Sequence, residues 1–159
     1  SLAKYIYGSA EVVGLMCLAA FIRHGGLDYS REEKLRLADG AKALGSAFQK
    51  VNFLRDLAAD FNTLGRSYFP GITATNFTDA DRDRLVAEIS EELEIAANEL
   101  PNLPPACSRA VAAALMLFSE LNHKISQTPA ARLTTTRIRV GNARKLVIVT
   151  RAYFGGKAK

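Results

Sequence analysis

The stretch from Gln49 to Asp60 reads Gln-Lys-Val-Asn-Phe-Leu-Arg-Asp-Leu-Ala-Ala-Asp. Four of its polar residues follow one another at spacings of three, four and four, which places them on one face of an α-helix. These four are Gln49, Asn52, Asp56 and Asp60. Apolar residues fill the positions between them, so the stretch predicts a helix with a single polar face.

Apolar residues with a helical period also run through the rest of the chain. The Val-Ile-Val run at 147–149 could be a strand, but no other segment alternates with a period of two to pair with it. We therefore predict an all-α fold of about five helices, and the length of 159 residues fits one domain covering residues 1–159. The expected helices cover about residues 2–24, 31–64, 79–98, 105–126 and 141–154.

Several helix ends are marked by capping residues. Ser30 and Glu33 have the spacing of a capping box, and Thr78 precedes a first turn rich in aspartate. Gly25-Gly26 is typical of a left-handed helix end. The helix over 2–24 is apolar on nearly all sides, so we expect it to be central rather than on the surface.

The charge is unevenly distributed. The chain has 21 Lys+Arg and 16 Asp+Glu, yet residues 121–159 contain only basic charges. Such a segment is suited to an anionic membrane surface or a phosphorylated substrate, although a solvated basic face is an equal alternative. Nucleic acid is not an expected partner, because few aromatic residues interleave with the basic ones and no known nucleic-acid-binding motif is present.

Two cysteines, Cys17 and Cys107, lie in apolar surroundings. We expect free, buried thiols and a reducing compartment, hence a cytoplasmic protein, with peripheral membrane attachment as a variant of that location. No run of about 18 consecutive apolar residues exists, so a membrane-spanning helix is not expected.

The polar face of 49–60 has the composition of a magnesium site. Asp56 and Asp60 repel each other at this spacing, and no cationic residue is expected between them on that face. Carboxylate oxygens combined with a neutral amide oxygen from Asn52 suit Mg²⁺, which also takes phosphate oxygens from a substrate. The alternative is a solvated polar face, but the neighbouring phenylalanines favour a cleft. Downstream, Arg66 and Tyr68 are able to contact a phosphate.

Together these residues resemble the squalene and phytoene synthase family, most closely the bacterial phytoene synthases. Residues 52–60, followed by Gly-Arg-Ser-Tyr-Phe-Pro at 65–70, are similar to the family's second aspartate-rich motif. Residues 5–16 resemble its upstream tyrosine block, and residues 43–49 its approach to the motif. Residues 137–146 resemble its basic C-terminal segment.

The resemblance implies an isoprenoid-synthase helical fold and Mg²⁺-dependent head-to-head condensation of two geranylgeranyl diphosphates to phytoene, in carotenoid biosynthesis. Mn²⁺ is an alternative metal. Squalene or dehydrosqualene synthesis from farnesyl diphosphate is an alternative activity, and a non-catalytic basic helical binding module is an alternative of another class.

The resemblance also assigns roles to residues. Asn52, Asp56 and Asp60 would hold the metal on the diphosphate, with Asp56 and Asp60 also counted as catalytic. Gln49 and Arg55 would contact metal-bound water or the diphosphate. Arg66 and Tyr68 would line the mouth of the site, and Tyr5 would face the reacting carbons as a further catalytic residue.

Some positions depart from the family pattern. Gly8 replaces a usual tyrosine, Glu11 a usual glycine, and Ala59 a common acidic residue. The family's first aspartate-rich motif lies upstream of the tyrosine block, which here starts at Tyr5. The chain therefore resembles the C-terminal half of such an enzyme. We expect it to be inactive alone, and to self-associate through apolar surface that the other half would cover.

Overall fold

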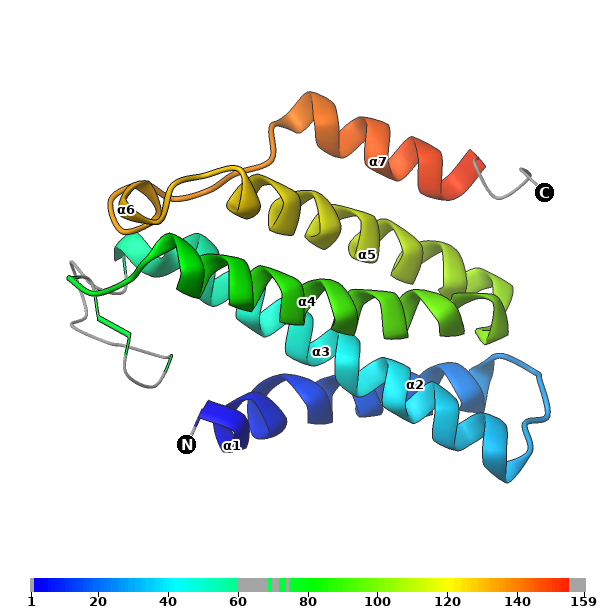
Figure 1. Cartoon of the computed structure of the whole chain (residues 1–159). Helices are drawn as coiled ribbons and strands as arrows, with labels where there is room; N and C mark the ends of the chain where they lie inside the picture. Colours follow the sequence, from blue (N-terminus) through cyan, green and yellow to red (C-terminus); the bar gives the residue numbers. More distant parts are fainter. Residues whose placement is uncertain (1, 60–68, 70–71, 74, 155–159) are drawn as a thin grey trace.

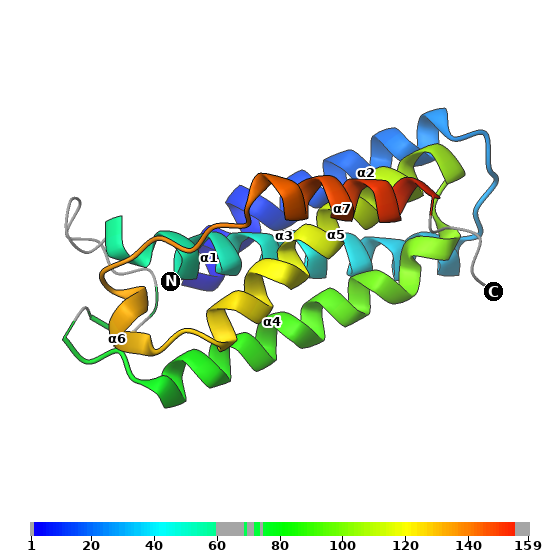
Figure 2. The ribbon, with the colours of Figure 1, turned by 90° about the horizontal axis from the view of Figure 1, so that it is seen from above.

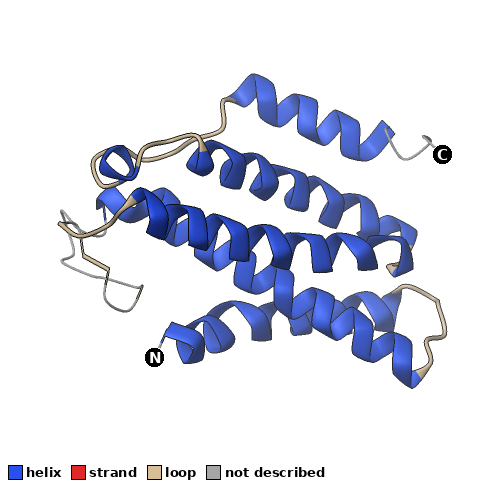
Figure 3. Ribbon diagram, in the orientation of Figure 1, coloured by secondary structure: helices blue, strands red, loops and turns tan. Residues whose placement is uncertain are grey.

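The computed structural model describes residues 2–59, 69, 72–73 and 75–154. Every regular element in these ranges is a helix, which confirms the all-α prediction (Figure 3). The elements are α1 (Leu2–Ile6), the π-helical turn η1 (Tyr7–Glu11), α2 (Val12–His24), α3 (Arg31–Ala59), α4 (Asp79–Glu99), the 3-10 turn η3 (Leu100–Asn102), α5 (Pro105–Ser126), α6 (Ala130–Leu133) and α7 (Asn142–Phe154).

All five expected helices are present. The first contains the π-helical turn η1, and the end of the second, residues 60–64, lies outside the described residues. The sequence did not predict α6, which is only four residues long. The Val-Ile-Val run belongs to α7, so the choice of helix over strand there is confirmed.

The long helix α3 is the centre of the fold. It contacts α1, η1, α2, α4, α5 and α6, and α7 packs on α5 at the outer edge (Figure 1). Seen from above in Figure 2, the C-terminal end of α3 lies at the same end of the bundle as α1, α6 and the start of α4. This end therefore gathers segments from both halves of the sequence around the last turns of α3.

The predicted helix caps form as expected. The backbone N–H of Glu33 donates to Ser30 Oγ at 3.2 Å, and that of Ser30 donates to Glu33 Oε2 at 2.8 Å. Thr78 and Asp81 make the equivalent reciprocal pair at the start of α4. Gly26 has φ of +67°, the left-handed conformation expected after a helix end.

The expectation that residues 2–24 form a central helix is wrong. Glycines allow α2 and η1 to lie backbone against backbone on α3, because a Cβ at Gly14 would collide with the carbonyl of Ala41, and one at Gly45 with that of Ala10. The opposite face remains uncovered by the described residues, and Met16 is 66% exposed. Such apolar surface is what the predicted self-association requires; the association itself stays a prediction.

The same helical stretch, Leu2–His24, is long and apolar enough to cross a membrane, judged by length and composition alone. A count of consecutive apolar residues does not detect this stretch, because Lys4 and Glu11 interrupt the run.

The cysteine prediction is partly wrong: both thiols are free, but Cys17 is exposed and Cys107 is only partly buried.

A buried charge cluster fixes α3 against α4. Lys50 is 7% exposed and pairs with Glu92 at 2.6 Å and with Glu88, while Ser46 Oγ donates to Glu92 at 2.7 Å. Burial lowers the pKa of Lys50, but its two carboxylate partners outweigh burial and leave that pKa raised. Burial raises the pKa of Glu92 despite the opposing bonds from Lys50 and Ser46. These contacts between α3 and α4 restrict rotation of α3 about its own axis. They therefore also determine which way the polar face around Asn52 and Asp56 points.

Candidate functional site

The polar face predicted on α3 lies at the C-terminal end of this helix. Gln49, Asn52 and Asp56 are all partly buried, and Gln49 lines an apolar pocket that is described below. Buried residues on the neighbouring faces, Phe53 and Leu57, anchor these turns in the core. Asp60 lies outside the described residues, as do Arg66 and Tyr68.

Asp56 is held between two arginines. Its Oδ2 accepts from Arg55 at 2.7 Å, and its Oδ1 lies 2.5 Å from Nε of Arg137. The expectation that no cation lies between Asp56 and Asp60 stays a prediction, because Asp60 lies outside the described residues, but Asp56 itself has two cationic partners. Arg137 is 81 residues away in sequence, so only the fold brings it to the carboxylate. In the absence of metal, the two guanidinium groups compensate the charge of Asp56.

The segment that carries Arg137 is anchored on both sides of this residue. Ile138 N–H donates to the carbonyl of Arg55 at 3.4 Å, next to the end of α3. Val140 is buried in the main core, and Lys124 donates to the carbonyl of Arg139 at 3.2 Å. The sequence signal was the alternation of arginine with Ile138 and Val140, which indicates a segment with one face in the core and one face charged.

Tyr5 lies at the same end of the bundle. Its ring centroid is 6.0 Å from that of Phe53, and the side chain is 52% exposed. Phe53 in turn meets Phe69 edge-on, also at 6.0 Å. Tyr5 therefore packs on α3 at Phe53, the residue after Asn52. Phe53 lies beside the polar face, on the side opposite to Arg55.

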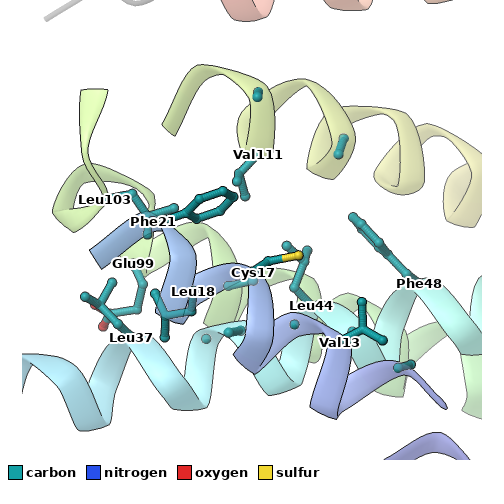
Figure 4. Close-up of a pocket in the computed structure, with 18 of the residues that line it drawn as sticks. Val13, Cys17, Leu18, Phe21, Leu37, Leu44, Phe48, Glu99, Leu103 and Val111 are labelled. Carbon is teal, nitrogen blue, oxygen red and sulfur yellow. The ribbon is translucent and has the colours of Figure 1, made fainter. Parts of the chain in front are cut away.

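An apolar pocket of about 460 Å³ lies between α2, α3 and α5 (Figure 4). One end is formed by Val13 and Phe48, whose ring stacks on Phe118 of α5 at 3.7 Å. The other end is formed by Phe21 and Leu103. The size is in the range of ligand-binding cavities, and side chains of α2 and α5 supply two of the walls.

The pocket and the polar face are continuous along α3. Ala41, Gly45 and Phe48 line the pocket, and Gln49 lines it as well. Asn52 and Asp56 follow one and two turns later on the adjacent strip of the helix surface. On α3 the apolar pocket therefore ends at Gln49, about one turn before the charged end, which is the layout needed by a ligand with a long apolar tail and an anionic head.

The described part of the chain contains no group of three His, Cys, Asp or Glu side chains able to hold a metal. Asn52 and Asp56 provide one amide and one carboxylate oxygen. Mg²⁺ commonly takes only one or two protein carboxylates, with water and phosphate completing its shell, so these two donors fit one side of such a site. Arg55 and Arg137 would then have to release Asp56 and turn to the phosphate.

A second pair of aspartates has the same spacing, Asp79 and Asp83 at the start of α4. Arg82 bridges them at 2.7 and 2.8 Å. Asp79 also accepts from the backbone N–H of Ala130 at 2.8 Å, which fastens α6 to α4. This pair is engaged in holding the fold together, so spacing alone does not separate a binding pair from a structural one.

Comparison with known proteins gives the class. The Squalene/phytoene synthase family matches residues 1–144, and the chain belongs to this family. Its fold is that of the helical isoprenoid synthases, as the resemblance implied. Among individual relatives, the chain is 33% identical over 137 residues to the phytoene synthase of Pseudescherichia vulneris. This match covers 77% of the chain and 41% of that relative. No solved structure matches the chain.

Proposed function

We propose that this chain binds a prenyl diphosphate and contributes the second aspartate-rich wall of a phytoene synthase-type site. The reaction would be the head-to-head condensation of two geranylgeranyl diphosphates in carotenoid biosynthesis. The observation that carries the proposal is the continuity of the apolar pocket with Asn52 and Asp56 along one side of α3. Tail and diphosphate would then lie along a single helix.

Length supports a tail of twenty carbons. Asn52 and Leu37, which lines the far part of the pocket, are 15 residues apart on α3, or about 22 Å at ~1.5 Å per residue. An extended prenyl chain gains roughly 5 Å per five-carbon unit, from four backbone bonds of ~1.5 Å each. A tail of four units, about 20 Å, fills this distance. A farnesyl tail, about 15 Å, leaves one unit of the pocket empty.

The charged end suits the departure of a diphosphate. Asn52 and Asp56 would hold Mg²⁺, or Mn²⁺ as the alternative, with Asp60 as a further ligand. The metal would supply charge stabilisation for the leaving group. Arg55 and Arg137 supply two cations at the same end, where both pair with Asp56, and Gln49 borders it. The roles of Tyr5, Arg66 and Tyr68 follow from the resemblance and remain predictions.

The apolar walls would protect the other product of ionisation. An allylic carbocation reacts with water, so it needs a surrounding from which water is excluded. The pocket exposes mostly carbon, with Phe48 and Phe21 at its two ends. Because the chain spans 41% of its relative's length, and the assigned site has one aspartate face, we expect binding without coupling by the chain alone.

The location is a separate proposal. On α7, Ile148 and Ala152 are buried, whereas Leu146, Tyr153 and Phe154 are 69%, 54% and 81% exposed. Lys145 and Arg151 belong to the same helix, within the basic segment that has no acidic residue. An apolar face flanked by cations matches an anionic lipid surface. We place the protein in the cytoplasm with α7 as its contact to such a membrane.

The test is to fill the pocket. Ala114→Phe places a ring in the cavity from α5, where Ala114 lines it. This variant should bind geranylgeranyl thiodiphosphate at least about tenfold more weakly, a loss of ~1.4 kcal/mol, while inorganic diphosphate binds as before. Ala19→Phe is the control, because Ala19 is exposed on α2 and lines neither end of the pocket. Equal binding by both variants would refute the assignment of the tail to this pocket.

A further inference from the structure

Phe21 borders two cavities. It lines the far end of the apolar pocket, and it also lines a second cavity of about 410 Å³. This second cavity lies beyond the end of α2, between His24, Gly25 and the start of α5 at Pro104 and Cys107. One aromatic side chain is thus common to the walls of both spaces.

The direction of the pocket gives Phe21 its position. On α2, Val13, Cys17 and Phe21 line the pocket at spacings of four residues and so form one row along the helix. In Figure 4 this row runs from Val13, near Phe48, to Phe21, whose ring lies beside Leu103. A tail that enters from Gln49 therefore meets Phe21 last.

The surroundings of Phe21 are fixed by close packing. A Cβ at Gly25 would collide with Pro104, so the end of α2 lies directly against the start of α5. Tyr29 Oη donates to the carbonyl of Asn102 at 2.8 Å, which fastens the α2–α3 connection to η3. A wall held in this way cannot easily move outward to admit a longer ligand.

We propose that Phe21 determines the length of the prenyl chain that this pocket accepts. The inference rests on the proposed function and adds to it a residue that selects the substrate. With the ring in place, the part of the pocket between Asn52 and Leu37 takes about four five-carbon units. Without the ring, the second cavity becomes an extension with room for at least one further unit.

Substitutions should shift the preference in both directions. Phe21→Ala should open the path into the second cavity and favour a chain of twenty-five carbons. Phe21→Trp should shorten the pocket and favour fifteen carbons over twenty. Met16→Ala is the matched control, since Met16 is on the same helix, is 66% exposed and lines neither cavity.

The experiment is calorimetric titration of the 159-residue chain and its variants with farnesyl, geranylgeranyl and geranylfarnesyl thiodiphosphates in the presence of Mg²⁺. Circular dichroism before each titration checks that the helices are retained. If Phe21→Ala does not fold, Phe21→Leu replaces it, because leucine keeps much of the packing volume while removing the ring. The measured quantity is the ratio of affinities for adjacent chain lengths, which cancels any general weakening.

We expect the ratio of C25 to C20 affinity to rise at least about tenfold in Phe21→Ala, and the ratio of C15 to C20 affinity to rise in Phe21→Trp. Met16→Ala should leave both ratios unchanged. Binding of all three ligands with unchanged ratios in the Phe21 variants would overturn the role of Phe21 and leave the proposed function standing. Failure of every ligand to bind, or binding that ignores Mg²⁺, would overturn the proposed function and this inference with it.

Discussion

Replacing Asp56 by asparagine should have opposite effects on diphosphate binding with and without Mg²⁺. With the metal, diphosphate binding should weaken, because the variant lacks the carboxylate that we assign as a ligand of Mg²⁺. Without the metal, the change releases Arg55 and Arg137 from their pairs with Asp56 at 2.7 and 2.5 Å. Two freed guanidinium groups bind phosphate well, so metal-free binding should be equal or stronger.

The magnitudes follow from the geometry. Loss of a metal ligand should cost at least the 10- to 100-fold in metal affinity that is typical of outer-shell partners. The effect on stability is smaller, because the side chains of Asp56, Arg55 and Arg137 are 26%, 26% and 48% exposed. Two such pairs contribute about 1 kcal/mol to the free energy of unfolding. Relief of the repulsion between Asp56 and Asp60 offsets a few tenths of a kcal/mol of that loss. The net loss corresponds to a decrease in Tm of about 2–3 °C.

The assay is titration with geranylgeranyl thiodiphosphate in Mg²⁺ and in EDTA, together with the Tm of the metal-free protein. Asp39→Asn serves as the control, because Asp39 is also on α3 but is 73% exposed and pairs only loosely with Lys42 at 3.6 Å. This control should change neither affinity. An Asp56→Asn variant that binds as tightly as the parent in Mg²⁺ would remove Asp56 from the site.

Three further predictions concern other residues. Arg137→Gln should weaken diphosphate binding about tenfold, with or without metal. Arg139→Gln should not, because the backbone of Arg139 rather than its side chain holds the segment. Equal effects of the two substitutions on the titrated affinities would contradict the assignment of Arg137. Lys50→Met leaves Glu92 half-buried without its cation and should cost about 3 kcal/mol in urea unfolding at pH 7; Glu92→Gln in the same chain should restore much of it. The raised pKa of Glu92 favours its protonated form in the folded state. The loss of unfolding free energy in Lys50→Met should therefore shrink as the pH falls toward the ordinary glutamate range and grow as the pH rises. A loss that does not depend on pH would contradict this. Leu146→Ser with Tyr153→Ser should reduce flotation with phosphatidylglycerol vesicles and leave diphosphate binding unchanged; flotation equal to that of the parent, or insensitive to salt, would refute the role of α7.

The fold could be predicted from local signals because helix periodicity and caps are local. Ser30 with Glu33 and Thr78 with its following turn fixed two helix starts from a few residues each. The central position assigned to residues 2–24 failed for the opposite reason. Hydrophobicity indicates that a helix can be buried, but the partner that covers each face is set by distant residues such as Ala41 and Gly45.

The site was predictable only in part. The spacing from Gln49 to Asp56 identified one polar face, since that relation lies within a single helix. The partnership of Arg137 with Asp56 could not be read from spacing, because it depends on how the segment after α6 crosses the end of α3. The same limit applies to Asp79 and Asp83, whose spacing matches the motif while Arg82 gives them a structural role. The pocket likewise depends on the packing of three helices.

The central claim is that one side of α3 binds an apolar tail and a metal-bound diphosphate together. Its most direct test is a calorimetric comparison of geranylgeranyl thiodiphosphate and inorganic diphosphate, each with Mg²⁺ and with EDTA. We predict saturable binding of the prenyl ligand that requires Mg²⁺ and exceeds that of inorganic diphosphate by at least about 100-fold, or ~2.7 kcal/mol from the buried tail. Equal affinity for the two ligands, or prenyl binding that persists undiminished in EDTA, would contradict the claim.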